Sequence, residues 1–194
     1  MARKYNSRRR AESAEHTRQA IIEAAVKMHG KGITTLPAVA EEAGVSLPTV
    51  NKYFPTREDL FNACTSHVAA NLEYTPPETL LAISNPGNRL RRVVREIYRL
   101  NEETFGHSWT GYKLEDESPV LAQAIANAEG LVAALAETLP YEGTAGNQDT
   151  MKCFVRALLN PLTYRALRLK NGLSFEEAVE HMTMALAAVL NIKV

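Results

Sequence analysis

The stretch that most constrains the fold of this chain is Leu36–Leu60, LPAVAEEAGVSLPTVNKYFPTREDL. Apolar residues at 36, 39, 40 and 43 follow the i, i+3, i+4, i+7 pattern of a short helix, which Gly44 ends. Ser46, with a proline two residues later, is typical of the start of a second helix. Thr56 and Asp59 match a capping box that begins a third helix. Two short helices joined by a tight turn containing glycine predict a helix-turn-helix, whose second helix fits the major groove of DNA.

The same residues resemble a known family. The segment from Ala40 to Leu60 combines AGVS, a later Thr, a Tyr-Phe pair, Pro and a basic residue, and it resembles the signature of the TetR family of bacterial transcriptional repressors. The preceding segment RQAIIEAAVKM resembles the first helix of that family. The resemblance covers roughly the first third of the chain. It implies an all-α fold of about nine helices. Residues 1–60 would form a three-helix DNA-binding domain, and residues 61–194 a larger effector-binding and dimerisation domain.

The resemblance and the helix pattern together predict the side chains that contact DNA. Thr49, Asn51 and Lys52 are expected on the groove face, and Leu47 near a thymine methyl. In the family a Tyr that contacts the DNA backbone commonly stands where this chain has Asn51, so a base contact and a phosphate contact both remain open. The alternative to DNA binding is an ordinary helical core with solvated lysine and arginine side chains. The predicted DNA-binding set is Thr35, Ser46, Leu47, Pro48, Thr49, Asn51, Lys52, Tyr53 and Arg57, with Thr35, Tyr53 and Arg57 at phosphates.

The N-terminal end is strongly basic within a chain of zero formal net charge. The first 18 residues contain six Lys and Arg against two Asp and Glu. Residues 1–13 are expected to be disordered without DNA. Arg8, Arg9 and Arg10 would follow the phosphate backbone or enter the minor groove, or form only a solvated tail. A local basic arm on a neutral chain favours a defined DNA footprint over general polyanion binding.

The remainder of the chain predicts further helices after a hinge at Pro76-Pro77. Their expected bounds are about 88–105, 118–139, 149–170 with a kink at Pro161, and 174–191. The intervening stretch GHSWTGYKLEDESPV is expected to be less regular. The arginines of the first of these helices are expected mainly on a solvated face, some paired with nearby glutamates.

The two C-terminal helices carry more apolar surface than one small domain needs, which predicts a homodimer. In proteins of the TetR type these helices pair across a two-fold axis, and a palindromic double-stranded DNA operator would match such a dimer. The candidate interface residues are Leu159, Leu162, Met182, Leu186 and Val189.

The resemblance also implies a pocket for a small-molecule effector in the larger domain. Apolar walls with few polar groups suit a largely hydrophobic ligand. For each aromatic residue the alternative is plain core packing, and the sequence does not identify the ligand. The pocket candidates are Tyr98, Phe105, His107, Trp109, Tyr112, Phe154 and Tyr164.

Other classes of protein fit the sequence less well. No run resembles a membrane span and the N-terminus has no apolar leader, so a cytoplasmic protein without a membrane partner is expected. Cys64 and Cys153 do not make a disulfide framework, and Cys64-x-x-His67 offers two metal ligands at most, so no metal or cofactor is expected. No catalytic motif is present, which argues against an enzyme. A second rival is a DNA-binding dimer without a small ligand, controlled by abundance or by a protein partner.

Overall fold

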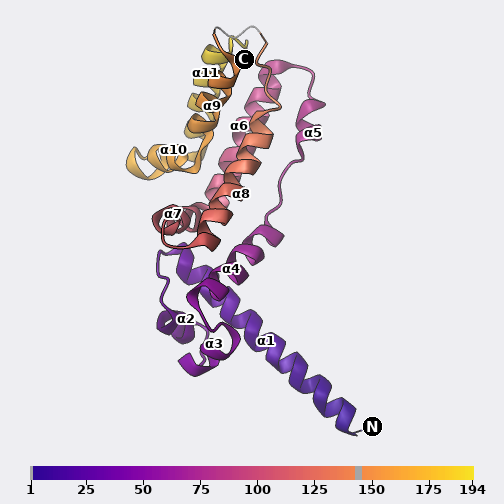
Figure 1. Ribbon diagram of the computed structural model, residues 1–194. Coiled ribbons are helices and arrows are strands. Elements are labelled where there is room, and N and C mark those ends of the chain that lie inside the picture. Colours follow the sequence, from indigo (N-terminus) through magenta and orange to yellow (C-terminus); the bar gives the residue numbers. More distant parts are fainter. Residues whose placement is uncertain (1, 143–145) are drawn as a thin grey trace. The chain divides into compact units, whose positions relative to one another are not determined.

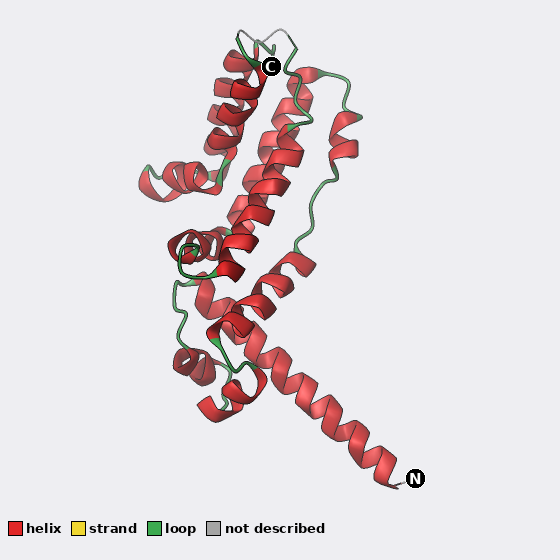
Figure 2. Cartoon of the chain, in the orientation of Figure 1, coloured by secondary structure: helices red, strands yellow, loops and turns green. Residues whose placement is uncertain are grey.

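The computed structural model describes residues 2–142 and 146–194, with side chains from residue 9 onward. These residues form eleven α-helices and one π-helix, without any strand among them (Figures 1 and 2). The prediction of an all-α fold is confirmed, and the helices are slightly more numerous than the nine expected. The chain divides into two compact units, one of Met1–Leu72 with Trp109–Ala124 and the other of Glu73–Ser108 with Ile125–Val194.

The first unit begins with four helices, α1 (Ala2–Gly30), α2 (Leu36–Glu42), α3 (Leu47–Tyr53) and α4 (Arg57–Asn71). The turn between α2 and α3 needs Gly44, whose φ of +66° lies in the left-handed region that side chains disfavour. Apolar side chains from all four helices pack into one core. Its buried members are Ile21, Ile22, Ala24, Ala25, Val39, Ala40, Val50, Phe54, Leu60 and Cys64.

The start of α1 differs from the prediction. Residues 2–13 are helical and continuous with the rest of α1, where a disordered arm was expected. This part has no apolar stripe, so periodicity gave no signal for a helix there. It continues a helix whose later turns are fixed by packing from Ile21 onward.

The end of α7 (Phe105–Leu114) and the start of α8 (Pro119–Ala136) belong to the first unit. The stretch expected to be irregular is therefore largely helical. Its residues Thr110 and Gly111 are buried, so packing stabilises a segment whose two glycines disfavour a helix. The predicted domain boundary at residue 60 lies within α4, all of which clusters with the first unit.

The second unit is organised around α6 (Pro86–Glu103) and α11 (Phe175–Leu190), which form its most extensive helix pair. Asn85 caps α6 by accepting the Asn88 amide at 2.8 Å, and the Ser174–Glu177 capping box begins α11 as predicted. The short helix α5 (Pro77–Leu81) precedes α6. Apolar residues from several helices of this unit, including Leu90, Ile97, Leu159 and Leu186, are fully buried.

The predicted kink at Pro161 is a complete break. α9 (Gln148–Leu159) ends there, and α10 (Pro161–Arg165) continues into a π-helix, η1 (Ala166–Lys170). Asn160 has an extended backbone with ψ of 146°, and its side chain accepts the Leu162 amide at 2.8 Å. Because proline has no N–H and Asn160 caps a new helix, α10 leaves the direction of α9 (Figure 1).

The expectation that no run resembles a membrane span needs a correction. By length and composition, α8 qualifies, with a mean hydropathy of 1.4 over Pro119–Ala136. Its leucine, isoleucine and valine residues raise this value most, and 28% of that window is buried inside the protein.

Two arginines of α6 form ion pairs, and Arg91 and Arg92 are exposed as predicted. Arg99 pairs with Glu96 at 2.9 Å and with Glu103 at 2.5 Å, as the spacing of these residues allows. Arg95 pairs with Glu176 of α11 at 2.5 Å. The pairs of Arg99 lie within α6, whereas the pair of Arg95 joins α6 to α11.

Candidate DNA-binding interface

The outer face of α3 carries the side chains predicted to contact DNA bases. Leu47, Pro48, Asn51 and Lys52 are exposed, whereas Val50 is fully buried in the core. Residues three and four apart share one face of a helix, so the four exposed side chains form a single outward surface. An amide, an ammonium and an apolar group on such a surface supply the chemistry that reads adenine, guanine and the thymine methyl.

The start of α3 is held by its N-cap. Ser46 Oγ accepts the Thr49 amide at 3.3 Å and lies 2.8 Å from Thr49 Oγ1. Thr49 is therefore only half-exposed, and its hydroxyl is engaged in the cap. This bond orders the first turn of α3 and fixes the position of the Thr49 hydroxyl.

The three residues predicted to contact phosphates differ in exposure and in the partners that their side chains already have. Thr35 is exposed at the start of α2 and its side chain makes no capping bond, which leaves the hydroxyl accessible. Tyr53 is half-buried, with Lys52 Nζ 5.7 Å from its ring centre. Arg57 lies 3.9 Å from a carboxylate oxygen of Glu117, so a phosphate would compete with an existing ion pair.

The basic end of α1 presents Arg9 and Arg10, which are both exposed. The side chain of Arg8, the third predicted arm residue, lies outside the described part. Because the backbone here is a continuation of α1, the helix fixes the direction in which each arginine side chain leaves the helix axis.

Hydrogen bonds from two buried hydroxyl groups join the α7–α8 corner to α1 and α4, and sequence reasoning missed both. Thr110 Oγ1 donates to the carbonyl oxygen of His29 at 2.7 Å. Ser118 Oγ donates to Glu58 Oε2 at 2.7 Å and accepts the Leu121 amide at 3.2 Å. The sequence indicated Ser118 as a helix start, but a partner 60 residues away has no local signal.

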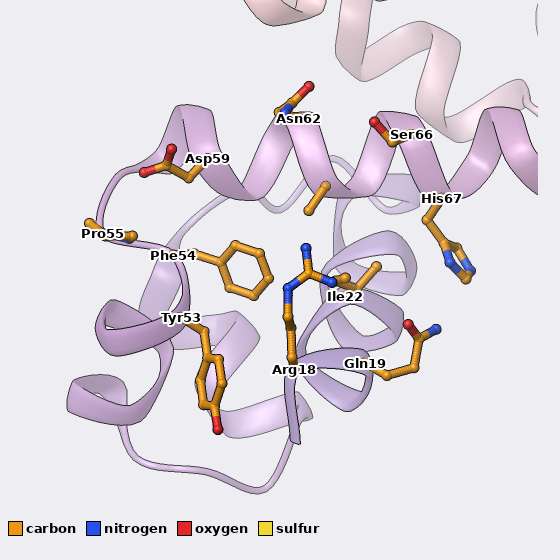
Figure 3. A pocket seen from close by; sticks show the side chains of 11 residues that line it. Arg18, Gln19, Ile22, Tyr53, Phe54, Pro55, Asp59, Asn62, Ser66 and His67 are labelled. Atoms are coloured by element: carbon orange, nitrogen blue, oxygen red, sulfur yellow. The ribbon is translucent and has the colours of Figure 1, made fainter. Parts of the chain in front are cut away.

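A cleft of about 520 Å³ opens between α1, the end of α3 and α4 (Figure 3). We call it the α1–α4 cleft. It is lined by Arg18, Gln19, Ile22, Tyr53, Phe54, Pro55, Asp59, Asn62, Ala63, Ser66 and His67. Of these residues only Tyr53 belongs to the predicted DNA-binding set, and none belongs to the predicted effector pocket.

The structure gathers only part of the predicted effector pocket. Tyr98 and Tyr164 are fully buried with ring centres 4.6 Å apart, and Phe105 packs edge-on to Tyr164 at 6.4 Å. Phe154 is 48% exposed, and Trp109 and Tyr112 belong to the first unit. Burial lowers the pKa of His107, which favours a neutral imidazole. The tight aromatic group therefore reads as core packing with Phe105 at its edge.

The predicted dimer residues fall into two groups. Leu159, Met182 and Leu186 are buried within the chain's own second unit and have little surface left for a partner. Leu162 is 43% exposed and Val189 is half-buried. Sequence reasoning did not select the more exposed apolar residues of the same region, which are Phe154, Leu169 and Met184.

The pair considered as metal ligands is divided by burial. Cys64 packs in the core of the first unit, and burial raises the pKa of its thiol to about 12. His67 lies on α4 at the α1–α4 cleft. A protonated thiol inside an apolar core is a packing group rather than a metal ligand.

The helix-turn-helix residues of this interface lie in a segment that matches a known sequence family. Residues 21–64 match the sequence profile of a family described as bacterial regulatory proteins, tetR family. The matched residues include α2 and α3 and parts of α1 and α4, which form the core beneath the exposed face. No curated protein sequence gives a significant match.

Solved structures share the fold over nearly the whole chain. A putative TetR-family transcriptional regulator from Mesorhizobium loti has 18% sequence identity and a TM-score of 0.64, and the match covers 92% of this chain and 96% of that one. The TetR-like regulator LfrR from Mycobacterium smegmatis, in complex with proflavine, has 24% identity and a TM-score of 0.56 over 91% and 97%. The multidrug binding protein EbrR, complexed with imidazole, has 22% identity and a TM-score of 0.53 over 91% and 90%.

Proposed function

We propose that this chain, whose residues 21–64 match the model of the tetR family of bacterial regulatory proteins, is a cytoplasmic repressor that binds a palindromic operator as a homodimer. A small, largely hydrophobic ligand would release it from DNA. The observation that carries the proposal is the capped helix α3, which presents Leu47, Pro48, Asn51 and Lys52 outward from a packed helix-turn-helix.

Base reading would rest on Asn51 and Lys52. An exposed amide can donate to and accept from one adenine edge, and an ammonium can donate to guanine O6 and N7. Leu47 would contact a thymine methyl. Thr35 and Tyr53 at phosphates, with Arg9 and Arg10 along the neighbouring backbone, would supply the part of the affinity that depends on salt and not on sequence.

Dimerisation would use the exposed apolar surface of α9, α10, η1 and α11. Phe154, Leu162, Leu169 and Met184 are between 43% and 60% exposed. The small residues Ala157, Ala185 and Ala188 on α9 and α11 are also exposed and would let helices approach closely. A palindromic operator requires the two copies of α3 to lie about 34 Å apart, one turn of DNA.

The α7–α8 corner would couple the binding of a ligand to the release of the protein from DNA. Thr110 and Ser118 hold this corner to the end of α1 and the start of α4 by buried hydrogen bonds. A ligand that favours another position of α7 would therefore displace the helices that support α3. The coupling equals the ligand's difference in affinity between the two arrangements.

The existence of an effector is supported by two fold relatives, LfrR with proflavine and EbrR with imidazole. The rival is a regulator without a small ligand, and full burial of Tyr98 and Tyr164 favours it, since packed aromatic rings leave no room between them. The two readings differ in whether any small molecule lowers operator affinity.

The test is a mobility shift of the purified protein on the DNA that flanks its own gene, repeated at several salt concentrations. Specific binding that weakens steeply with salt supports the DNA-binding part of the proposal. A screen for release by planar hydrophobic compounds then tests the effector. Equal binding to every sequence would contradict an operator-specific regulator.

A further inference from the structure

The α1–α4 cleft has the dimensions of a small-molecule site. Its volume of about 520 Å³ lies within the range of pockets that hold drug-sized ligands. Three helices of the DNA-binding core form its walls, so their mutual packing fixes its shape. A ligand seated here would touch α1, the end of α3 and α4 at the same time.

The inner wall of the cleft is apolar and aromatic. Phe54 and Ile22 are 3% and 4% exposed, and both line the cleft. Tyr53 adds a second ring from the end of α3, and Pro55 a further apolar surface. Flat apolar surfaces next to a ring favour a planar, partly apolar ligand.

One cation lies in the middle of this lining. Figure 3 shows the Arg18 guanidinium beside the ring of Phe54, and its central carbon is 5.5 Å from that ring's centre. Arg18 pairs with Glu15 of the same helix across 3.8 Å, and the side chain of Glu15 is 69% exposed. The guanidinium therefore retains donors for a carboxylate, which its planar fork matches in geometry.

The negative charge in the lining is already engaged. Asp59 Oδ2 accepts the Thr56 amide at 3.0 Å and the Thr56 hydroxyl at 2.7 Å, which closes the capping box of α4. The positive end of the α4 dipole also offsets this charge. In Figure 3 Asp59 lies at the far end of the cleft from Gln19 and His67, which flank Arg18 on its other side.

We propose that the α1–α4 cleft binds a small planar carboxylate, with the carboxylate on Arg18 and the ring against the accessible surfaces of Tyr53 and Pro55. Gln19 and His67 supply polar contacts at one end. This site shares no residue with the effector pocket predicted from the sequence. It lies within the DNA-binding core, so its occupant would act on α1, α3 and α4 without help from the α7–α8 corner.

The probe for the test is 2-naphthoate, titrated into the ¹⁵N-labelled full-length protein while amide chemical shifts are recorded. For a ligand of this size we expect a Kd on the order of 1 mM. Saturable shifts should cluster at the residues that line the cleft. The neutral isostere 2-naphthamide should bind at least roughly tenfold more weakly, because it loses the charge-assisted bond to arginine.

Three variants sharpen the result. Arg18→Gln should weaken 2-naphthoate roughly tenfold or more and remove the preference over the amide. Ala63→Leu should block both ligands by filling the cleft. Arg10→Gln removes an exposed arginine of the same helix outside the cleft and should leave binding unchanged.

The proposal is overturned if saturable shifts miss the cleft, if both ligands bind alike, or if Arg10→Gln weakens binding as much as Arg18→Gln. Operator binding is measured separately by mobility shift. A protein that binds the probe but no operator would contradict the proposed function and leave the cleft site standing, and the reverse result would do the opposite.

Discussion

Ser118 joins α8 to α4, and its removal should cost far more than the loss of an ordinary surface hydroxyl. Its side chain is fully buried, donates to the carboxylate of Glu58 at 2.7 Å and accepts the Leu121 amide at 3.2 Å. A hydrogen bond to a charged partner contributes about 1.5–3 kcal/mol, and an N-cap contributes about 1 kcal/mol. Because one hydroxyl serves both, Ser118→Ala should lower the free energy of unfolding by about 2–4 kcal/mol.

The assay is thermal and urea unfolding at equal chain concentrations, since dimerisation links stability to concentration. For a chain of this length the loss corresponds to a fall in Tm of roughly 4–15 °C. Ser66→Ala is the matched control. Ser66 is exposed on α4, and its replacement should change stability by no more than about 0.5 kcal/mol.

A double-mutant cycle with Glu58→Gln isolates the bond between the two side chains. The two substitutions should be non-additive by about 1 kcal/mol, because Ser118→Ala removes the donor and Glu58→Gln removes the charge that strengthens the same bond. Strictly additive effects, or a Ser118→Ala loss as small as that of Ser66→Ala, would refute the assignment of this bond as the link between α8 and α4.

Three further predictions concern DNA, acid and assembly. Lys52→Ala should weaken operator binding and reduce the slope of log K against log salt by up to about 0.9, and an unchanged slope in the mobility shift would contradict a contact with DNA. The hydrogen bond from Arg168 holds the pKa of Glu102 below its usual range. The ionised Glu102 therefore stabilises the folded state fully above the pKa that it has in the unfolded chain, and this stabilisation is lost as pH falls through its lower pKa in the folded state. Urea unfolding at pH 7 and pH 3 should therefore show a smaller acid-induced loss for Glu102→Gln than for the native chain, and equal losses would exclude this role. Met184→Lys should shift the protein towards monomer in size-exclusion chromatography with light scattering. Leu81 on α5 is equally exposed, and Leu81→Lys should leave the dimer intact. Dissociation by both variants or by neither would contradict the proposed interface.

The helix-turn-helix could be predicted because its signals are local. Gly44, Ser46 and the Thr56–Asp59 pair each act within four residues, and the structure shows the positive φ and both caps. Helix α7 gave no such signal. Its glycines and mixed polarity disfavour a helix, and the segment is held by burial of Thr110 and its bond to a carbonyl of α1.

Periodicity also fails to distinguish a chain's own core from a partner's surface. On α11 both the buried Leu186 and the exposed Met184 are apolar, and the sequence pattern selected Met182 and Leu186, which are buried within the chain's own second unit. Which apolar face a helix turns inward depends on its neighbours, here α6, and those contacts lie far apart in sequence. The α1–α4 cleft could not be predicted for the same reason, because its lining comes from three separate segments of the chain.

The continuity of α1 makes the basic end of the protein sensitive to helical phase. Each residue of an α-helix turns the chain by about 100°, so inserting one alanine near residue 14 would rotate Arg9 and Arg10 by that angle around the axis and advance them by about 1.5 Å. A flexible tail would absorb the insertion without consequence. On a rigid rod, four inserted residues would nearly restore the original facing, whereas two would turn the arginines almost to the opposite side.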